Sequence, residues 1–217
     1  MKKPDATLWE LTSAIVAGDA SEVSRMLAAA PELAQASFQT GATRQASKSY
    51  FLDRILRYVY AGDTALHIAA AAYQKEIAGR LIAAGANVFA KNRLGDEPLH
   101  AAAVGGPGSR TWNPSAQAET IRCLIEAGAD PNAVDKRDVT PLHRAVRTRC
   151  ALAVRTLLEC GADSARRNKS GSTPMLLATL NTGRPGSGSA EAKAQQQEIL
   201  RLLKKAVISR QRSASSD

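Results

Sequence analysis

Three histidines are the residues of this chain best suited to acid–base catalysis or to binding a metal ion. They are His67, His100 and His143, the only histidines among 217 residues, and each lies in a short motif that recurs along the chain. A catalytic or metal site would need the three imidazoles to converge on one point. Equivalent residues of stacked repeats instead lie about 10 Å apart, one in each layer. We therefore interpret the histidines as structural.

The remaining residues form no catalytic or metal-binding signature. Cys123, Cys150 and Cys160 are an odd number of cysteines without metal-type spacing. If Cys150 and Cys160 occupy the two ends of one helix, they lie about 15 Å apart, which is too far for a disulfide. Neither a G-x-S-x-G nor an H-E-x-x-H motif is present. We expect reduced, buried thiols in a reducing compartment, no enzymatic activity, no cofactor and no bound metal.

The histidine motifs lie in copies of one sequence unit. Residues 138–163 read DVTPLHRAVRTRCALAVRTLLECGAD, and residues 62–87 read GDTALHIAAAAYQKEIAGRLIAAGAN. Related segments start at Gly95, with GDEPLHAAA, and at Gly171, with GSTPMLLAT. The starts at 62 and 95 are 33 residues apart, and so are those at 138 and 171. A period of this size is typical of a stacked repeat protein, and together with the motif T-P-L-H-x-A it resembles the ankyrin repeat family.

This resemblance implies an all-α solenoid of helix-turn-helix units with short finger hairpins. We expect a single domain over residues 1–208 and a disordered tail over 209–217. The expected units span about 6–36, 62–94, 95–137, 138–170 and 171–207, with an insert at 37–61; the first and last units are caps. Segments such as LHRAVRTRC give the chain a general similarity to bacterial ankyrin repeat proteins of undefined role.

Three insertions interrupt the period. The second half of the insert, YFLDRILRYVY at residues 50–60, has apolar residues at helical spacing and predicts a short extra helix, which either packs on the stack or binds a partner. The helical stripe comprises Phe51, Leu52, Ile55, Leu56 and Val59. Residues 105–114, GGPGSRTWNP, and 181–189, NTGRPGSGS, lengthen loops between inner and outer helices. Trp112 is either tucked against the outer helices or exposed as a binding anchor. The 181–189 segment fits a flexible linker better than an anion cradle, because the lysine of a phosphate loop is missing.

Several positions depart from the repeat pattern. The resemblance implies that the threonine and histidine of T-P-L-H hydrogen-bond to each other and to nearby backbone. Glu97 replaces this threonine, so we expect the link to be weakened in that repeat. Asp138 replaces the finger glycine, which predicts a strained or remodelled turn. Leu176 replaces the histidine in the last unit, where an outer helix is expected over residues 190–207.

The formal net charge of +9 favours acidic partners. The resemblance implies binding through a concave surface made of finger tips and the exposed side of inner helices. Carried over by position, the partner-binding residues are Arg93, Leu94, Asp96, Lys136, Arg137, Val139, Arg144, Arg147, Thr148, Lys169, Ser170 and Ser172, with Trp112 as a possible anchor. We hypothesise that a monomer binds another protein with an acidic surface or an acidic peptide.

Non-specific binding of nucleic acid or of an anionic membrane through the basic face and tail is the alternative. Aromatic residues make up only 4% of the chain, which argues against base stacking. The N-terminus has no apolar signal region, and no apolar run approaches the length of about 18 residues that a membrane span needs. We expect a soluble cytoplasmic protein.

Overall fold

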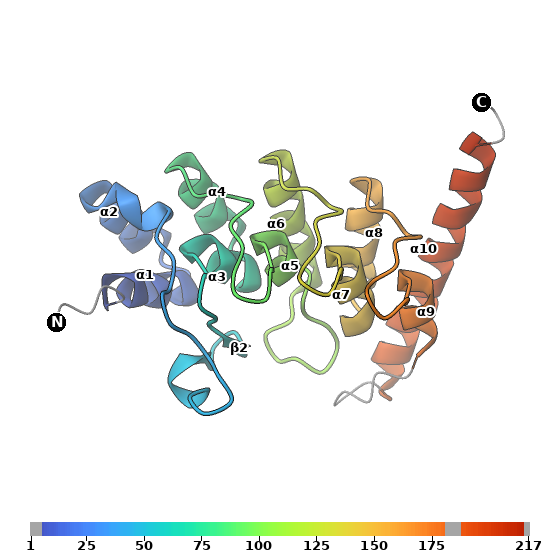
Figure 1. Ribbon diagram of the computed structural model, residues 1–217, viewed down its shortest axis with the longest axis horizontal. Helices are drawn as coiled ribbons and strands as arrows, with labels where there is room; N and C mark the ends of the chain where they lie inside the picture. The colour runs from blue at the N-terminus through green and yellow to red at the C-terminus, as the bar shows by residue number, and fades with distance from the viewer. Residues whose placement is uncertain (1–5, 181–187, 215–217) are drawn as a thin grey trace.

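The computed structural model describes residues 6–180 and 188–214, with side chains up to residue 208. Its helices form two parallel rows that run the length of an elongated molecule (Figure 1). The inner row consists of α1 (Ala6–Ala17), α3 (Ala65–Ala71), α5 (Pro98–Ala102), α7 (Pro141–Thr148) and α9 (Pro174–Thr179). The outer row consists of α2 (Ala20–Ala29), α4 (Lys75–Ala83), α6 (Pro114–Glu126), α8 (Ala151–Glu159) and α10 (Ala190–Ala214). The predicted all-α repeat solenoid is confirmed.

Local sequence sets the limits of each helix. Proline begins α5, α7 and α9, at a position where its missing N–H has no helical partner to lose. A glycine follows most outer helices and takes the left-handed conformation that ends them, as Gly85 does with φ 91°. Between the rows, Leu66, Leu99 and Leu142 are fully buried. The small alanines that surround these leucines let successive layers approach closely.

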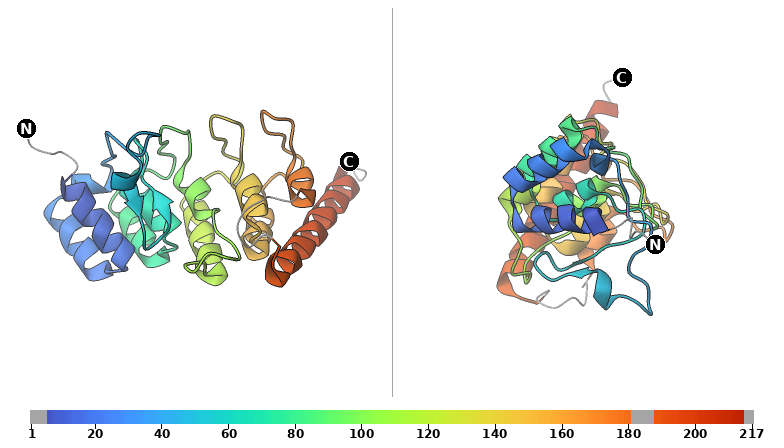
Figure 2. Two further views of the ribbon diagram at one scale, coloured as in Figure 1. Left: turned by 90° about the horizontal axis from the view of Figure 1, so that it is seen from below. Right: turned by 90° about the vertical axis from the view of Figure 1, so that its left-hand side faces the viewer.

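Finger loops connect α4, α6 and α8 to the inner helix that follows each of them, at residues 87–96, 130–139 and 163–172. They project from one edge of the molecule (Figure 2, left). Each finger donates a backbone hydrogen bond to the preceding layer: Arg93 N–H to Ala61 O, Lys136 N–H to Leu94 O and Lys169 N–H to Arg137 O, at 2.7, 3.1 and 2.9 Å. Adjacent layers are therefore joined through their backbones as well as through the core.

The turn at Asp138 keeps the finger geometry. Asp138 has φ 56°, in the same left-handed region as the glycines at the equivalent positions, Gly95 with 84° and Gly171 with 74°. Aspartate tolerates this region better than most residues with a side chain. The turn is thus not remodelled, and Asp138 adopts the conformation that glycine would take.

The extra helix predicted in the insert is wrong. The segment forms a short 3₁₀ helix, η2 (Lys48–Tyr50), and a hairpin of two antiparallel strands, β1 (Phe51–Leu52) and β2 (Arg57–Tyr58). Leu56, expected on the helical stripe, has φ 51° and lies in the hairpin turn. The rings of Phe51 and Tyr58 pack against each other across the two strands in a tilted arrangement, with centroids 4.7 Å apart. Pairing of these aromatic residues favours the hairpin over the helix.

The insert packs against the first repeat, which includes the 3₁₀ turn η1 (Pro31–Ala34) after α2. Phe38 is 1% exposed, and its ring lies 4.8 Å from that of Trp9 on α1. Phe38 N–H donates to Asp63 O, and Gly62 N–H donates to Phe38 O, so the two ends of the insert meet. The insert therefore leaves the stack and returns to it at almost the same point.

The last outer helix is longer than predicted. The sequence predicted its end near residue 207 and disorder over 209–217, but α10 continues to Ala214. Residues 215–217 lie outside the described residues, as do residues 181–187 of the predicted inter-helix linker. Within the described part of the chain, no helix is long and apolar enough to span a membrane.

Candidate partner-binding surface

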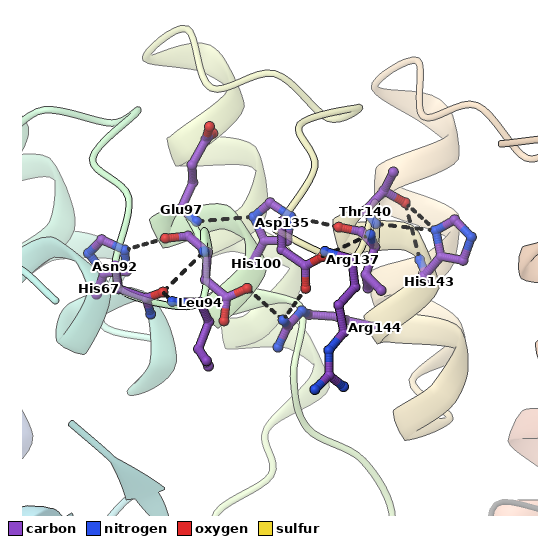
Figure 3. Close-up of polar contacts among 12 residues, drawn as sticks. His67, Asn92, Leu94, Glu97, His100, Asp135, Arg137, Thr140, His143 and Arg144 are labelled. Atoms are coloured by element: carbon purple, nitrogen blue, oxygen red, sulfur yellow. Dashed lines mark hydrogen bonds and ion pairs between the residues drawn. The ribbon is translucent and has the colours of Figure 1, made fainter. Parts of the chain in front are cut away.

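The three histidines lie in a row along the base of the fingers (Figure 3), and each contacts the finger of the next repeat. The Nε2 atom of His67 lies 2.9 Å from Asp96 O, that of His100 lies 3.0 Å from Val139 O, and that of His143 lies 3.1 Å from Ser172 O. In each case the carbonyl belongs to the finger of the following layer. The structural interpretation of the histidines is confirmed for each of them.

The other ring nitrogen of each histidine holds the start of its own helix. Nδ1 accepts the backbone N–H of Thr64, Glu97 and Thr140 in the three repeats. The threonine hydroxyls also contact Nδ1, at 3.0 Å for Thr64 and 2.8 Å for Thr140. Glu97 retains the backbone contact, and its carboxylate takes part in the same kind of capping box as the hydroxyls of Thr64 and Thr140. The replacement of threonine by Glu97 thus changes the side-chain link but keeps the tie between loop and helix.

Burial keeps the histidines neutral. It lowers the pKa of His67 and His143, and it lowers the pKa of His100 to about 4 with a contribution from the nearby charge of Arg144. A neutral, fully bonded imidazole inside the stack has no free nitrogen for a substrate or an ion. In the described ranges no cluster of histidine, cysteine or acidic side chains is arranged to hold a metal ion.

Arg144 of α7 connects two fingers through a buried ion-pair network. Its Nη2 atom lies 2.5 Å from Asp96 Oδ1 and 2.9 Å from Asp135 Oδ2 (Figure 3). Burial raises the pKa of Asp96, against the opposing effect of Arg144. Burial would also raise the pKa of Asp135. Hydrogen bonds from the backbone N–H groups of Val139 and Arg137, together with the Arg144 guanidinium, outweigh burial and lower this pKa.

This network gives a structural role to two of the residues that were predicted to contact a partner. Asp96 was expected on the exposed finger, but only 4% of its surface is accessible, and its charge is matched by Arg144. The side chain of Arg144 is 24% exposed and is committed to the same network. Asp96 and Arg144 therefore stabilise the fingers through this buried ion-pair network.

An equivalent ion pair fixes the insert, which the sequence did not indicate. Arg57 Nη2 lies 3.2 Å from both carboxylate oxygens of Asp63. Burial alone would raise the pKa of Asp63, yet Arg57, His67 and hydrogen bonds from Tyr60 and Asn92 lower it. Asp63 and Asp96 occupy the same position of the G-D motif, and each receives an arginine from elsewhere in the chain. The repeated aspartate was the signal that could have predicted both pairs.

Most of the other predicted contact residues are accessible. Exposed side chains are Arg93, Lys136, Arg137, Arg147, Lys169 and Ser170, and partly exposed ones are Leu94, Val139, Thr148 and Ser172. Arg93 is nevertheless held in place, because its guanidinium donates to Ala42 O at 2.6 Å and lies 5.0 Å from the ring of Tyr60. Lys169 Nζ donates to Lys136 O at 2.8 Å, so neighbouring finger tips are in contact.

Of the two alternatives for Trp112, the structure has the side chain packed inward and not exposed as a binding anchor. Its ring is half-buried and packs against the core, and Nε1 donates to Gln117 Oε1 at 3.1 Å. Gln117 in turn donates to Ala102 O at 2.9 Å. Trp112 therefore anchors the 105–114 loop to the end of α5.

Cys150 and Cys160 lie at the two ends of α8, as predicted. The prediction of buried thiols is right for Cys150 and wrong for Cys123 and Cys160, which are only partly buried. All three thiols are free. Cys150 is fully buried, whereas Cys123 and Cys160 are partly accessible. Burial raises the pKa of each thiol. None of them has the lowered pKa of a reactive cysteine.

Comparison with protein families gives matches over most of the repeats. A family model described as "Ankyrin repeats (3 copies)" matches residues 113–211, and one described as "Ankyrin repeat" matches residues 61–93. The second match coincides closely with the unit expected at 62–94.

Individual relatives share part of this chain. Mouse ankyrin repeat and SOCS box protein 16 is 38% identical over 114 residues, which are 52% of this chain and 24% of the relative. The E3 ubiquitin-protein ligase KEG of Arabidopsis thaliana is 33% identical over 155 residues, 66% of this chain and 9% of the ligase. Human B-cell lymphoma 3 protein is 33% identical over 129 residues, 56% of this chain and 26% of the relative. The chain thus spans about a quarter or less of the length of these relatives.

Proposed function

Because the chain belongs to the ankyrin repeat family, we propose that it binds another protein through its finger tips and the exposed side of its inner helices. Ankyrin repeats generally serve as protein–protein interaction modules. We further propose that the contacted surface of the partner is acidic. In this proposal the chain acts by binding as a monomer and performs no reaction of its own.

The distribution of charge along the fingers supports an acidic partner. Lys136, Arg137 and Lys169 are exposed on two adjacent finger tips. Asp96 and Asp135 of the same fingers are buried and matched by Arg144, and Asp138, next to Arg137, is only partly exposed. An incoming partner therefore meets an excess of positive charge, which favours acidic groups by electrostatic complementarity.

Affinity capture with charge-reversed fingers tests this proposal. The double variant Lys136→Glu, Arg137→Glu serves as bait in native lysate beside the unaltered chain, with captured proteins identified by mass spectrometry. Lys204→Glu on the exposed side of α10 is the control for charge reversal away from the fingers. We expect acidic proteins to be captured by the unaltered chain and by the control, and to be lost with the finger variant.

Two results would contradict the proposal. Equal capture by the finger variant would show that these lysine and arginine side chains do not contribute to binding. Absence of protein capture, together with binding to random duplex DNA that weakens steeply as salt rises, would favour the nucleic-acid alternative.

A further inference from the structure

A cavity of about 480 Å³ lies at the far end of the inner helices, away from the finger tips. It is bounded by the turn of the insert hairpin, by the C-terminal ends of α3, α5 and α7, and by the 105–114 loop. The insert and this loop both lie below the row of inner helices in Figure 1. Two segments that interrupt the repeat pattern thus meet around one cavity.

The walls of this cavity are fixed by specific contacts. Arg57 of the hairpin is held by its ion pair with Asp63. Tyr73 Oη donates to Val104 O at 2.5 Å, at the beginning of the 105–114 loop. At Gly106 the loop rests directly on α7, because a Cβ atom there would lie 1.7 Å from Thr148 O. The cavity is therefore formed before any ligand arrives, which lowers the entropic cost of binding.

The chemistry of the lining is cationic and apolar. Among the described residues that line it, the charged ones are Arg57, Arg147 and Arg149, and none is acidic. Arg57 is neutralised by Asp63, whereas Arg147 is exposed and has no hydrogen-bond or ion-pair partner in the part of the chain that the structure describes. Large apolar side chains at the cavity are also accessible, with Leu56 41% and Val104 36% exposed. These features suit a ligand with an acidic group beside an apolar one.

We propose that this cavity receives an acidic side chain and a neighbouring apolar side chain from an extended segment of the partner protein, with Arg147 binding the carboxylate. This inference rests on the proposed function and assigns a role to the two inserted segments. The helix α7 joins the two regions, since Arg144 at its beginning supports the fingers and Arg147 near its end lines the cavity. A segment bound across the fingers can continue along α7 into the cavity.

A double-mutant cycle with selected peptides tests this proposal. Random dodecapeptides are selected for binding to the full chain, and the dissociation constants of enriched peptides are measured by fluorescence anisotropy. Each peptide is compared with versions in which single Asp or Glu residues become Asn or Gln. The proteins compared are the unaltered chain, Arg147→Gln, Val104→Ser and the control Lys204→Gln, each checked for folding by circular dichroism.

We expect enriched peptides to contain an acidic residue next to an apolar one. Arg147→Gln should weaken binding about tenfold, and one acid-to-amide change in the peptide should have little further effect in that variant. Val104→Ser should weaken binding through the apolar contact, and Lys204→Gln should leave it unchanged.

The proposal is overturned if no peptide is enriched, or if Arg147→Gln and the peptide substitutions act independently. Peptides that lose affinity with Lys136→Glu, Arg137→Glu but not with Arg147→Gln would support finger binding and still overturn the cavity site. Failure of this inference can thus be distinguished from failure of the proposed function.

Discussion

Arg144 and Asp96 form an ion pair between neighbouring repeats, although 48 residues separate them in the chain. The same guanidinium also contacts Asp135, so one side chain joins two fingers to an inner helix. Both carboxylates are almost fully buried, with side chains 5% and 6% exposed. The arginine compensates both buried charges, and backbone N–H groups of Arg137 and Val139 add to this at Asp135.

Replacement of Arg144 should therefore destabilise the stack. Arg144→Met leaves two buried carboxylates without their cation, and we expect it to lower the free energy of unfolding by roughly 3 kcal/mol. Urea denaturation followed by circular dichroism measures the change. Arg147→Met, three residues along the same helix but exposed, is the control and should change stability by less than about 0.5 kcal/mol. Similar values for the two variants would show that the network contributes little.

Acidification should weaken the fold through the buried histidines. The pKa of His100 is lowered to about 4 in the folded chain, while the unfolded value is 6.5. Between these values the unfolded chain binds more protons, so stability falls as the pH falls from about 6.5 towards 4. For His100 alone the loss amounts to about 3 kcal/mol.

The variant His100→Gln isolates this contribution. Glutamine at this helical position can still accept the backbone N–H of Glu97 but does not titrate. Free energies of unfolding measured from pH 7 to pH 5 should decline less steeply for the variant than for the unaltered chain. The raised pKa values of Asp96 and Glu97 act in the opposite direction in both proteins, so the difference between the two slopes is the test. Identical slopes would show that His100 has an ordinary pKa in the folded state.

Two glycine-to-alanine substitutions should have opposite effects. Gly79 lies inside α4, and a Cβ atom there would meet no atom within 4 Å. Gly79→Ala should therefore stabilise the protein by about 0.5–1 kcal/mol through helix propensity. Gly106→Ala should destabilise it, because its Cβ atom would overlap Thr148 O. Thermal unfolding of both variants measures the signs, and stabilisation by Gly106→Ala would mean that the loop does not pack on α7.

Thiol labelling should distinguish the three cysteines. Cys150 is fully buried, whereas Cys123 and Cys160 are partly accessible. Reaction with an aromatic disulfide reagent should label two thiols of the folded chain at a measurable rate and the third only after unfolding in urea. The variant Cys150→Ser should lack the slow thiol. Rapid reaction of all three thiols in the folded chain would contradict the burial of Cys150.

The sequence predicted those parts of the structure that depend on the repeating unit. Leucine burial and proline at helix starts follow from local rules that apply once per repeat, so the repeating pattern predicted them, whereas the histidine ties were implied by the resemblance to the ankyrin family. The position of Cys150 and Cys160 at the two ends of one helix followed from the same register.

Parts of the structure that depend on single long-range contacts were not predictable in this way. The spacing of Leu52, Ile55, Leu56 and Val59 fits a helix, but aromatic pairing across a turn and the Arg57–Asp63 ion pair favour a hairpin. At the C-terminus, charge and serine content predicted disorder. No glycine or proline follows residue 190, however, and α10 continues to Ala214. For the candidate surface, position in the repeat identified exposed finger residues but could not show that Asp96 turns inward to meet Arg144.

The backbone hydrogen bonds between successive fingers also bear on how this molecule would respond to force. Each finger is tied to the layer before it, and each layer packs mainly on its immediate neighbours. Tension applied at the two ends is therefore carried in series through these ties. Under such a load the molecule should extend in steps, with one repeat unfolding at a time.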